Sequence, residues 1–141
     1  MNRGDAAGGG RADLVRKFMG DMSKGDFAVF KSAMADDVVY HLTGSHRFAG
    51  AYRGKEMILG LLDGVRSNFG ADGLHYEIDR VMEIGDTVVA TFKGSGTLAN
   101  GRAYSNDYCA IWDFDGDRLI KITEFFDSHH VCEVMSADPV A

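Results

Sequence analysis

The fold is decided by residues 74–127, LHYEIDRVMEIGDTVVATFKGSGTLANGRAYSNDYCAIWDFDGDRLIKITEFFD. Apolar and polar side chains alternate along much of this stretch, which is the period of a β-strand with one buried face. The pairs Gly85-Asp86, Asn100-Gly101 and Asp115-Gly116 interrupt the pattern, and such pairs are typical of hairpin turns. The stretch therefore predicts four long strands joined as an antiparallel meander.

Helices are expected before the meander. Apolar side chains recur at helical spacing near residues 14–22, 26–34 and 55–69. A β-branched and aromatic run, Val38 to Thr43, predicts a short strand between the second and third helices, and the Gly-rich segment 44–54 after it is expected to be a loop. Helices followed by an antiparallel meander form an α+β pattern.

Length and composition favour one domain of 141 residues with a hydrophobic core, because 45% of the chain is hydrophobic. We expect a single domain over residues 11–135, a disordered lead-in over residues 1–10 and a C-terminal tail over residues 136–141. No signal-peptide core and no apolar run of about 18 residues are present, so no membrane partner and a cytoplasmic location are expected.

Charge and metal-ligand spacing exclude several function classes. A net charge of −6 without a basic cluster disfavours nucleic acid as a partner. The two cysteines, Cys109 and Cys132, lack metal-ligand spacing and are expected to be reduced thiols. His129 and His130 would face opposite ways as neighbours in a strand, so no metal site is predicted.

The strand near residues 102–114 carries the clearest candidate site. One face is aromatic with a single amide, which is how small-molecule pockets are lined. The alternative is that these side chains form part of the hydrophobic core, with the tyrosine hydroxyls reaching solvent. Gly94 and Gly96, in the strand before it, indicate a bend or bulge. The residues of this face are Tyr104, Asn106, Tyr108, Ala110, Trp112 and Phe114.

Two segments carry a family resemblance. Residues 38–56, with Val38-Val39-Tyr40-His41-Leu42-Thr43-Gly44 at their start, and residues 106–127, with Thr123-Glu124-Phe125-Phe126-Asp127 at their end, resemble the SnoaL-like polyketide cyclase and ketosteroid isomerase branch of the nuclear transport factor 2-like superfamily. The resemblance implies a cone-shaped, cystatin-like fold. Its strongly bent, mainly antiparallel sheet has up to six strands, and three N-terminal helices close a pocket.

The resemblance also suggests which residues serve that pocket. Asp127 is expected as the catalytic carboxylate, because a carboxylate near apolar surface has a raised pKa, and a solvated strand-end aspartate is the alternative. His41 is expected as a second catalytic group or as a partner of Asp127, and a hydrogen-bonded core histidine is its alternative. Substrate-binding side chains are expected at Tyr40, Tyr52, Asn106, Tyr108, Trp112 and Phe125.

Three function classes follow. The first hypothesis is a cofactor-free acid–base enzyme of the isomerase, cyclase or dehydratase type, acting on a small apolar carbonyl compound. The second is a non-catalytic binding domain for a small apolar organic ligand, and the third is a dimeric protein-interaction module. Both faces of the late strands carry apolar residues, so a homodimer packed sheet to sheet is expected.

Overall fold

A computed structural model describes residues 10–135 of the chain. The predicted C-terminal tail, and the predicted lead-in except for Gly10, lie outside the described residues. No helix within residues 10–135 is long and apolar enough to cross a bilayer.

The elements follow the order that the sequence patterns predict, with two additions, β2 and α5. Glycines with positive φ form the turns between the long strands, among them Gly85 and Gly116. The elements are α2 (Arg11–Ser23), α3 (Ala28–Ala33), β1 (Met34–Leu42), β2 (Gly50–Arg53), α4 (Lys55–Ser67), β3 (Phe69–Ile84), β4 (Thr87–Leu98), β5 (Ala103–Asp115), β6 (Arg118–Phe126) and α5 (Ser128–Met135).

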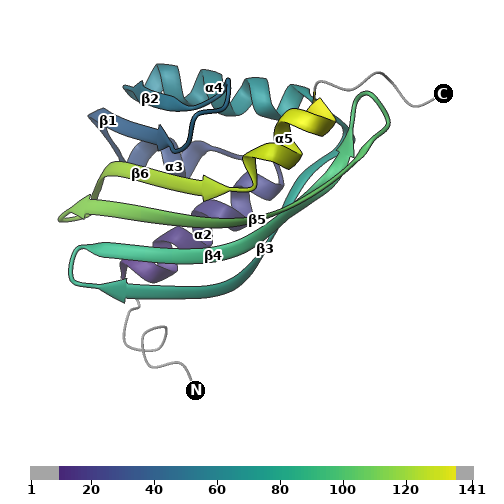
Figure 1. Ribbon diagram of the computed structural model, residues 1–141. Helices are drawn as coiled ribbons and strands as arrows, with labels where there is room; N and C mark the ends of the chain where they lie inside the picture. The colour runs from purple at the N-terminus through teal and green to yellow at the C-terminus, as the bar shows by residue number, and fades with distance from the viewer. Residues whose placement is uncertain (1–9, 136–141) are drawn as a thin grey trace.

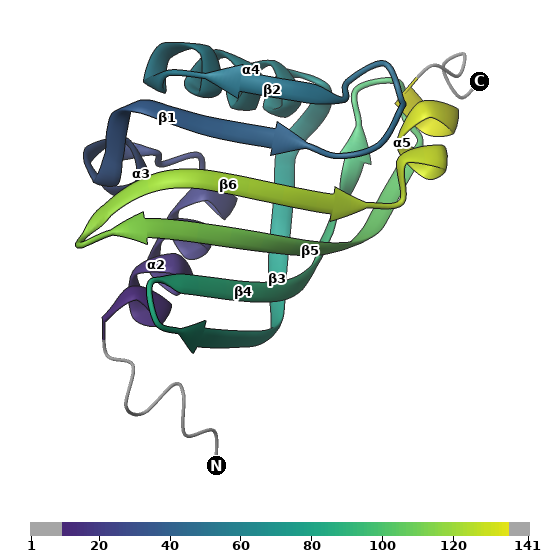
Figure 2. The ribbon, with the colours of Figure 1, turned by 60° about the vertical axis from the view of Figure 1, so that its left-hand side comes forward.

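The strands form one six-stranded sheet in the order β2-β1-β6-β5-β4-β3. Neighbours pair antiparallel except β1 and β6, which run parallel. The sheet bends strongly, and β3 turns away from the direction of β1, β6 and β5 (Figure 2). The predicted α+β fold with a bent, mainly antiparallel sheet of up to six strands is confirmed.

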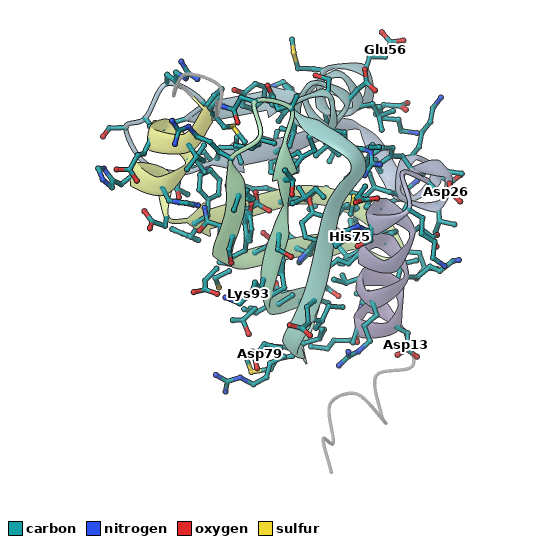
Figure 3. All side chains as sticks on the ribbon, turned by 90° about the vertical axis from the view of Figure 1, so that its right-hand side faces the viewer. Asp13, Asp26, Glu56, His75, Asp79 and Lys93 are labelled. Atoms are coloured by element: carbon teal, nitrogen blue, oxygen red, sulfur yellow. The ribbon has the colours of Figure 1, made fainter. Side chains whose placement is uncertain are left out.

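The hydrophobic core lies between the concave face of the sheet and the helices, which gather on that side (Figure 1). Phe18 from α2, Phe30 from α3 and Trp112 from β5 are buried there and pack as an aromatic cluster. Charged side chains such as Asp13, Asp79 and Lys93 lie at the periphery (Figure 3). This arrangement leaves the opposite, convex face of the sheet without a covering layer within residues 10–135.

Two segments differ from the sequence-based expectation. The predicted loop over residues 44–54 contains β2, which pairs with β1 through Tyr40 and Tyr52. His129 and His130 lie in α5 and not in a strand, because the chain turns after Phe126 and begins a helix at Ser128.

Gly94 and Gly96 allow close approach and do not form a bulge in β4. The β4–β5 register runs without a shift, whereas β3 shifts register between Phe69 and Leu74, opposite Gly96. A Cβ atom on Gly94 would lie 2.8 Å from Cε1 of Tyr108. The missing side chain at Gly94 therefore leaves space for the Tyr108 ring on the concave face.

Candidate functional site

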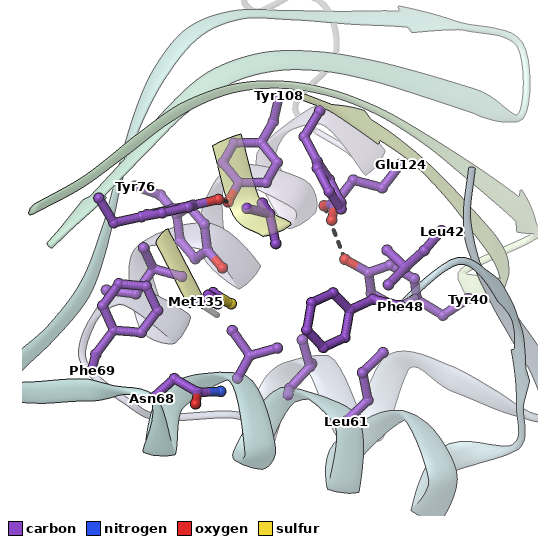
Figure 4. A pocket seen from close by; sticks show the side chains of 16 residues that line it. Tyr40, Leu42, Phe48, Leu61, Asn68, Phe69, Tyr76, Tyr108, Glu124 and Met135 are labelled. Carbon is purple, nitrogen blue, oxygen red and sulfur yellow. Dashed lines mark hydrogen bonds between the residues drawn. The ribbon is translucent and has the colours of Figure 1, made fainter. Parts of the chain in front are cut away.

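A cavity of about 90 Å³, here called the main cavity, lies between the concave face of the sheet and helices α4 and α5. Figure 4 shows Tyr76, Tyr108, Glu124 and Tyr40 pointing into it from the sheet side, opposite α4. The lining is mostly apolar with a few polar groups, as ligand pockets are. It consists of Tyr40, Leu42, Phe48, Leu61, Leu62, Val65, Asn68, Phe69, Leu74, Tyr76, Tyr104, Tyr108, Glu124, Phe126, Val131 and Met135.

Glu124 is the one carboxylate in the lining of the main cavity, among residues 10–135. The hydroxyl of Tyr40 donates a hydrogen bond of 2.9 Å to its Oε2 atom. Burial raises the pKa of Glu124 from 4.5 to about 7, and the hydrogen bond from Tyr40 opposes that rise. A group with such a pKa accepts and returns a proton near neutral pH.

A β-bulge in β6 determines which side chains of that strand face the cavity. Phe114 pairs with Leu119 and Asp113 with Lys121, so two residues of β6 advance against one of β5. Leu119 and Ile122 are consequently both buried, while Ile120, which strict alternation would put on the same face as Ile122, is exposed. From Ile122 onward the even-numbered residues face inward, which brings Glu124 to the cavity.

Four tyrosines line the cavity together with Glu124. Burial raises the pKa of Tyr40 and Tyr108 well above the usual value of 10.0, and it raises the pKa of Tyr76 and Tyr104 as well. All four hydroxyls therefore remain protonated at neutral pH. The proton of Tyr40 is engaged with Glu124, whereas Tyr76 and Tyr108 can donate hydrogen bonds to an oxygen atom of a ligand.

Tyr108 ends a chain of polar groups along β5. The amide nitrogen of Asn106 donates to the hydroxyl of Tyr104 over 3.1 Å, and the hydroxyls of Tyr104 and Tyr108 share a hydrogen bond. When Tyr104 donates in that bond, the proton of Tyr108 is free to point into the cavity. Successive hydrogen bonds polarise one another, so this chain strengthens Tyr108 as a donor.

The predicted substrate-binding residues divide into two groups. Tyr40 and Tyr108 line the main cavity, whereas Tyr52, Asn106 and Trp112 are absent from its lining within residues 10–135. The hydroxyl of Tyr52 donates to the backbone oxygen of Phe48. Asn106 is buried, but its amide binds both the backbone nitrogen and the backbone oxygen of Asp127, so it supports the site without facing it.

The expectation that Asp127 is a buried cavity carboxylate is wrong. Its side chain is exposed, and Oδ1 accepts a hydrogen bond from the backbone nitrogen of His130 in the first turn of α5. The bulge in β6 lies before Ile122 and leaves Asp127 out of phase with the inward residues Glu124 and Phe126. Asp127 therefore caps a helix, which is a common role of aspartate at such a position.

His41 and Phe125 also lie away from the main cavity. His41 borders a shallow depression on the convex face, together with Val39 and Lys121. Phe125 is 46% exposed and pairs with Cys109 on that same face. The predicted pairing of His41 with Asp127 in the cavity is therefore wrong. The predicted contact of Phe125 with a substrate in the cavity is wrong as well.

Glu124 and Tyr76 are site residues that were not predicted from the sequence, whereas Tyr104 belongs to the aromatic face that was. A signal for Glu124 exists in the sequence, because it alternates with Ile122 and Phe126 on the more apolar face of the last strand. A charged residue set in an apolar face is the observation that calls for explanation. Together the geometry provides one carboxylate of shifted pKa and several neutral donors in an apolar cavity, a set suited to proton transfer at carbon.

Comparison with known proteins identifies what the chain is similar to. The model of the SnoaL-like domain family matches residues 15–124. An uncharacterized protein of Mycobacterium tuberculosis strain H37Rv is 26% identical over 116 residues, which cover 81% of this chain and 86% of that protein.

Solved structures share the fold at low sequence identity. An NTF2-like protein of unknown function from Burkholderia pseudomallei K96243 superposes with a TM-score of 0.78 at 19% identity, covering 89% of this chain and 96% of that chain. A protein of Jannaschia sp. CCS1, provisionally described as a SnoaL-like polyketide cyclase, gives a TM-score of 0.76 at 16% identity and covers 90% of this chain and 92% of that chain.

Proposed function

Because the chain belongs to the SnoaL-like domain family, we propose that it is a cofactor-free acid–base enzyme acting on a small apolar carbonyl compound. The provisional description of the Jannaschia protein as a cyclase supports this reaction class. The observation that carries the proposal is Glu124, a carboxylate whose pKa of about 7 is set by burial in an otherwise apolar cavity.

Glu124 takes the role that the sequence analysis assigned to Asp127. Its carboxylate removes a proton from the carbon next to the carbonyl, and the electron pair moves to the carbonyl oxygen. The hydroxyl of Tyr108 donates a hydrogen bond to the resulting enolate oxygen, with support from Tyr104 and Asn106. Where the substrate has a C=C bond next to that carbon, return of the proton from Glu124 to the far end of the double bond shifts the double bond into conjugation with the re-formed carbonyl and completes an isomerisation.

The cavity limits the size of the substrate. Its volume of about 90 Å³ lies below the range of about 300–1,000 Å³ that is typical of pockets for drug-sized ligands. Leucines and Val65 from α4 face one side, and Val131 and Met135 from α5 close an end. We therefore expect a single apolar ring that carries one carbonyl group.

Hydrogen–deuterium exchange at the carbon next to a carbonyl tests this proposal directly. Cyclohexanone, 2-cyclohexenone and acetophenone in D₂O would be incubated with the protein and followed by proton NMR. The proposal predicts catalysed exchange for at least one probe, and a loss of about 100-fold or more in Glu124→Gln. Glu77→Gln, which removes an exposed carboxylate from β3, serves as the matched control.

Two outcomes of this experiment would reject the proposal. Exchange that survives in Glu124→Gln but disappears in Asp127→Asn would restore the assignment made from the sequence. Binding of the probes without exchange would favour the second hypothesis, a ligand-binding domain. The cavity itself disfavours the interaction module, because a module that binds a protein through its sheet face has no need of an internal cavity.

We also propose that a second copy of the chain covers the convex face of the sheet. Phe125 and Ile120 of β6 are exposed there, next to the half-buried Ile111 and Cys109 of β5. An apolar face of this kind is usually buried in a two-fold symmetric interface. A sheet-to-sheet homodimer leaves the main cavity, on the concave face, accessible.

A further inference from the structure

A second and smaller cavity, here called the inner cavity, lies behind the Tyr40–Glu124 pair. Its volume is about 20 Å³. Tyr40 and Glu124 line both this cavity and the main one, so the pair forms part of the wall between them. The rest of its lining is Met19, Met22, Phe30, Leu62, Tyr76, Phe92 and Trp112.

Trp112 contributes a polar group that has no partner in the described chain. The side chain is 3% exposed, and its Nε1 atom is fully buried without a hydrogen-bond acceptor among residues 10–135. A buried donor left unpaired destabilises a protein by about 1–3 kcal/mol. Native proteins satisfy nearly all such groups, either with protein atoms or with ordered water.

The sheet register places Trp112 close to the carboxylate. Trp112 pairs with Ile122, and Ala110 pairs with Glu124, in the antiparallel pair β5–β6. Trp112 and Glu124 are therefore diagonal neighbours on the concave face, with backbones about 7–8 Å apart. Both side chains line the inner cavity, so a molecule bound there lies within reach of the indole and the carboxylate.

We propose that the inner cavity binds a single water molecule, which accepts a hydrogen bond from Nε1 of Trp112 and donates one to the carboxylate of Glu124. One water needs about 10–15 Å³ of accessible space and two to four polar partners. The inner cavity has about 20 Å³ and offers Trp112, Glu124 and the hydroxyl oxygen of Tyr40 or Tyr76. The volume excludes a larger ligand.

The water makes Trp112 a positioning residue for Glu124. The carboxylate is then held from two sides, by Tyr40 on Oε2 and by the water in the inner cavity. This hydrogen bond favours the ionised form of Glu124. The water site stands independently of turnover, and only its benefit to catalysis rests on the proposed function.

Crystallography tests the site first. The wild-type structure at high resolution is expected to show one density peak within about 3.2 Å of both Nε1 of Trp112 and the carboxylate of Glu124. Trp112→Phe, which keeps the aromatic packing and removes the N–H, is expected to lose or displace that peak. A dry inner cavity, or a direct bond between the indole and Glu124, would overturn the inference.

Fluorescence supplies a second test that needs no change at Trp112, since it is the only tryptophan in the chain. Its emission is expected to titrate with Glu124, and Glu124→Gln is expected to abolish that transition, whereas Glu77→Gln retains it. The other titratable groups that act on Glu124 are Tyr40, Tyr76, Tyr104 and Tyr108, which stay neutral here. Arg66 of α4 acts on Tyr76.

The variants Trp112→Phe and Glu124→Gln distinguish a positioning role of Trp112 from a role in core packing alone. If the water links the residues, Trp112→Phe raises the pKa of Glu124 measured by carbon-13 NMR, because a donor to the ionised form is lost. The proposed water link would be overturned by an unchanged pKa of Glu124 in a folded Trp112→Phe protein. It would also be overturned if the pH transition of the Trp112 emission persisted in Glu124→Gln. Failure of the exchange assay on ketones would reject the proposed function and leave these results unaffected.

Discussion

The hydroxyl of Tyr40 on β1 donates a 2.9 Å hydrogen bond to Oε2 of Glu124 on β6, between the two strands of the sheet that run parallel. The backbone of Glu124 is fixed as well, because its carbonyl oxygen accepts bonds from the nitrogen and the hydroxyl of Thr43. Glu124 is therefore held at both its main chain and its side chain while it faces an apolar cavity.

Stability should depend on the ionisation of Glu124. Its pKa rises from 4.5 to about 7 on folding, so the folded state binds more protons than the unfolded state between those pH values. The stabilising contribution is complete below about pH 4.5 and is lost as the pH rises through about 7, by on the order of 3 kcal/mol. Urea unfolding of wild type and Glu124→Gln at a series of pH values measures the difference. Parallel curves for the two proteins would contradict the prediction.

Removal of the Tyr40 hydroxyl should raise the pKa of Glu124 further. The hydrogen bond from Tyr40 favours the ionised carboxylate and lowers its pKa, and Tyr40→Phe leaves burial unopposed. The acidic limb of any pH–rate profile is expected to move to higher pH. Tyr52→Phe is the control, because that hydroxyl binds the backbone of Phe48 instead. A lower or unchanged pKa in Tyr40→Phe would count against the assigned geometry.

Substitution of Gly94 should disturb the cavity. An added Cβ would lie 2.8 Å from the Tyr108 ring, which stacks on Phe92 at a centroid distance of 4.9 Å. Gly94→Ala is expected to destabilise the protein by about 1–3 kcal/mol and to weaken exchange activity by moving Tyr108. Gly20→Ala on α2 meets no atom within 4 Å and should instead stabilise by about 1 kcal/mol. Equal unfolding free energies for the two variants would contradict this account.

Formation of the proposed dimer should depend on the apolar residues of the convex face. Light scattering at low micromolar concentration is expected to give about twice the monomer mass of 15.3 kDa. Phe125→Glu places a charge on that face and should shift the mass to that of the monomer while the fold persists. A wild-type mass near 15.3 kDa would reject the dimer.

Much of the fold follows from periodicity and turns, because both are local. The two missed elements depend on distant partners. The short strand β2 forms only by pairing with β1, and α5 begins where Asn106 binds the backbone of Asp127. Neither contact leaves a local pattern in the sequence.

The site was predicted less well than the fold, for a physical reason. Strand parity propagates along the chain until a bulge reverses it, and the bulge in β6 has no clear sequence signature. Because of this bulge, Ile120 and Ile122 lie on opposite faces of the sheet. The parity of Glu124 with Ile122 and Phe126 was nevertheless readable from the sequence, and so was the opposite parity of Asp127, whose side chain is exposed.

The most direct measurement of the central claim is a carbon-13 NMR titration of the Glu124 side-chain carboxyl, assigned by its loss in Glu124→Gln. It requires no knowledge of the substrate. If Glu124 is the acid–base group of a buried apolar cavity, its carboxyl titrates with a pKa of about 7. A pKa near the ordinary value of 4.5 would show a solvated carboxylate and would contradict the account.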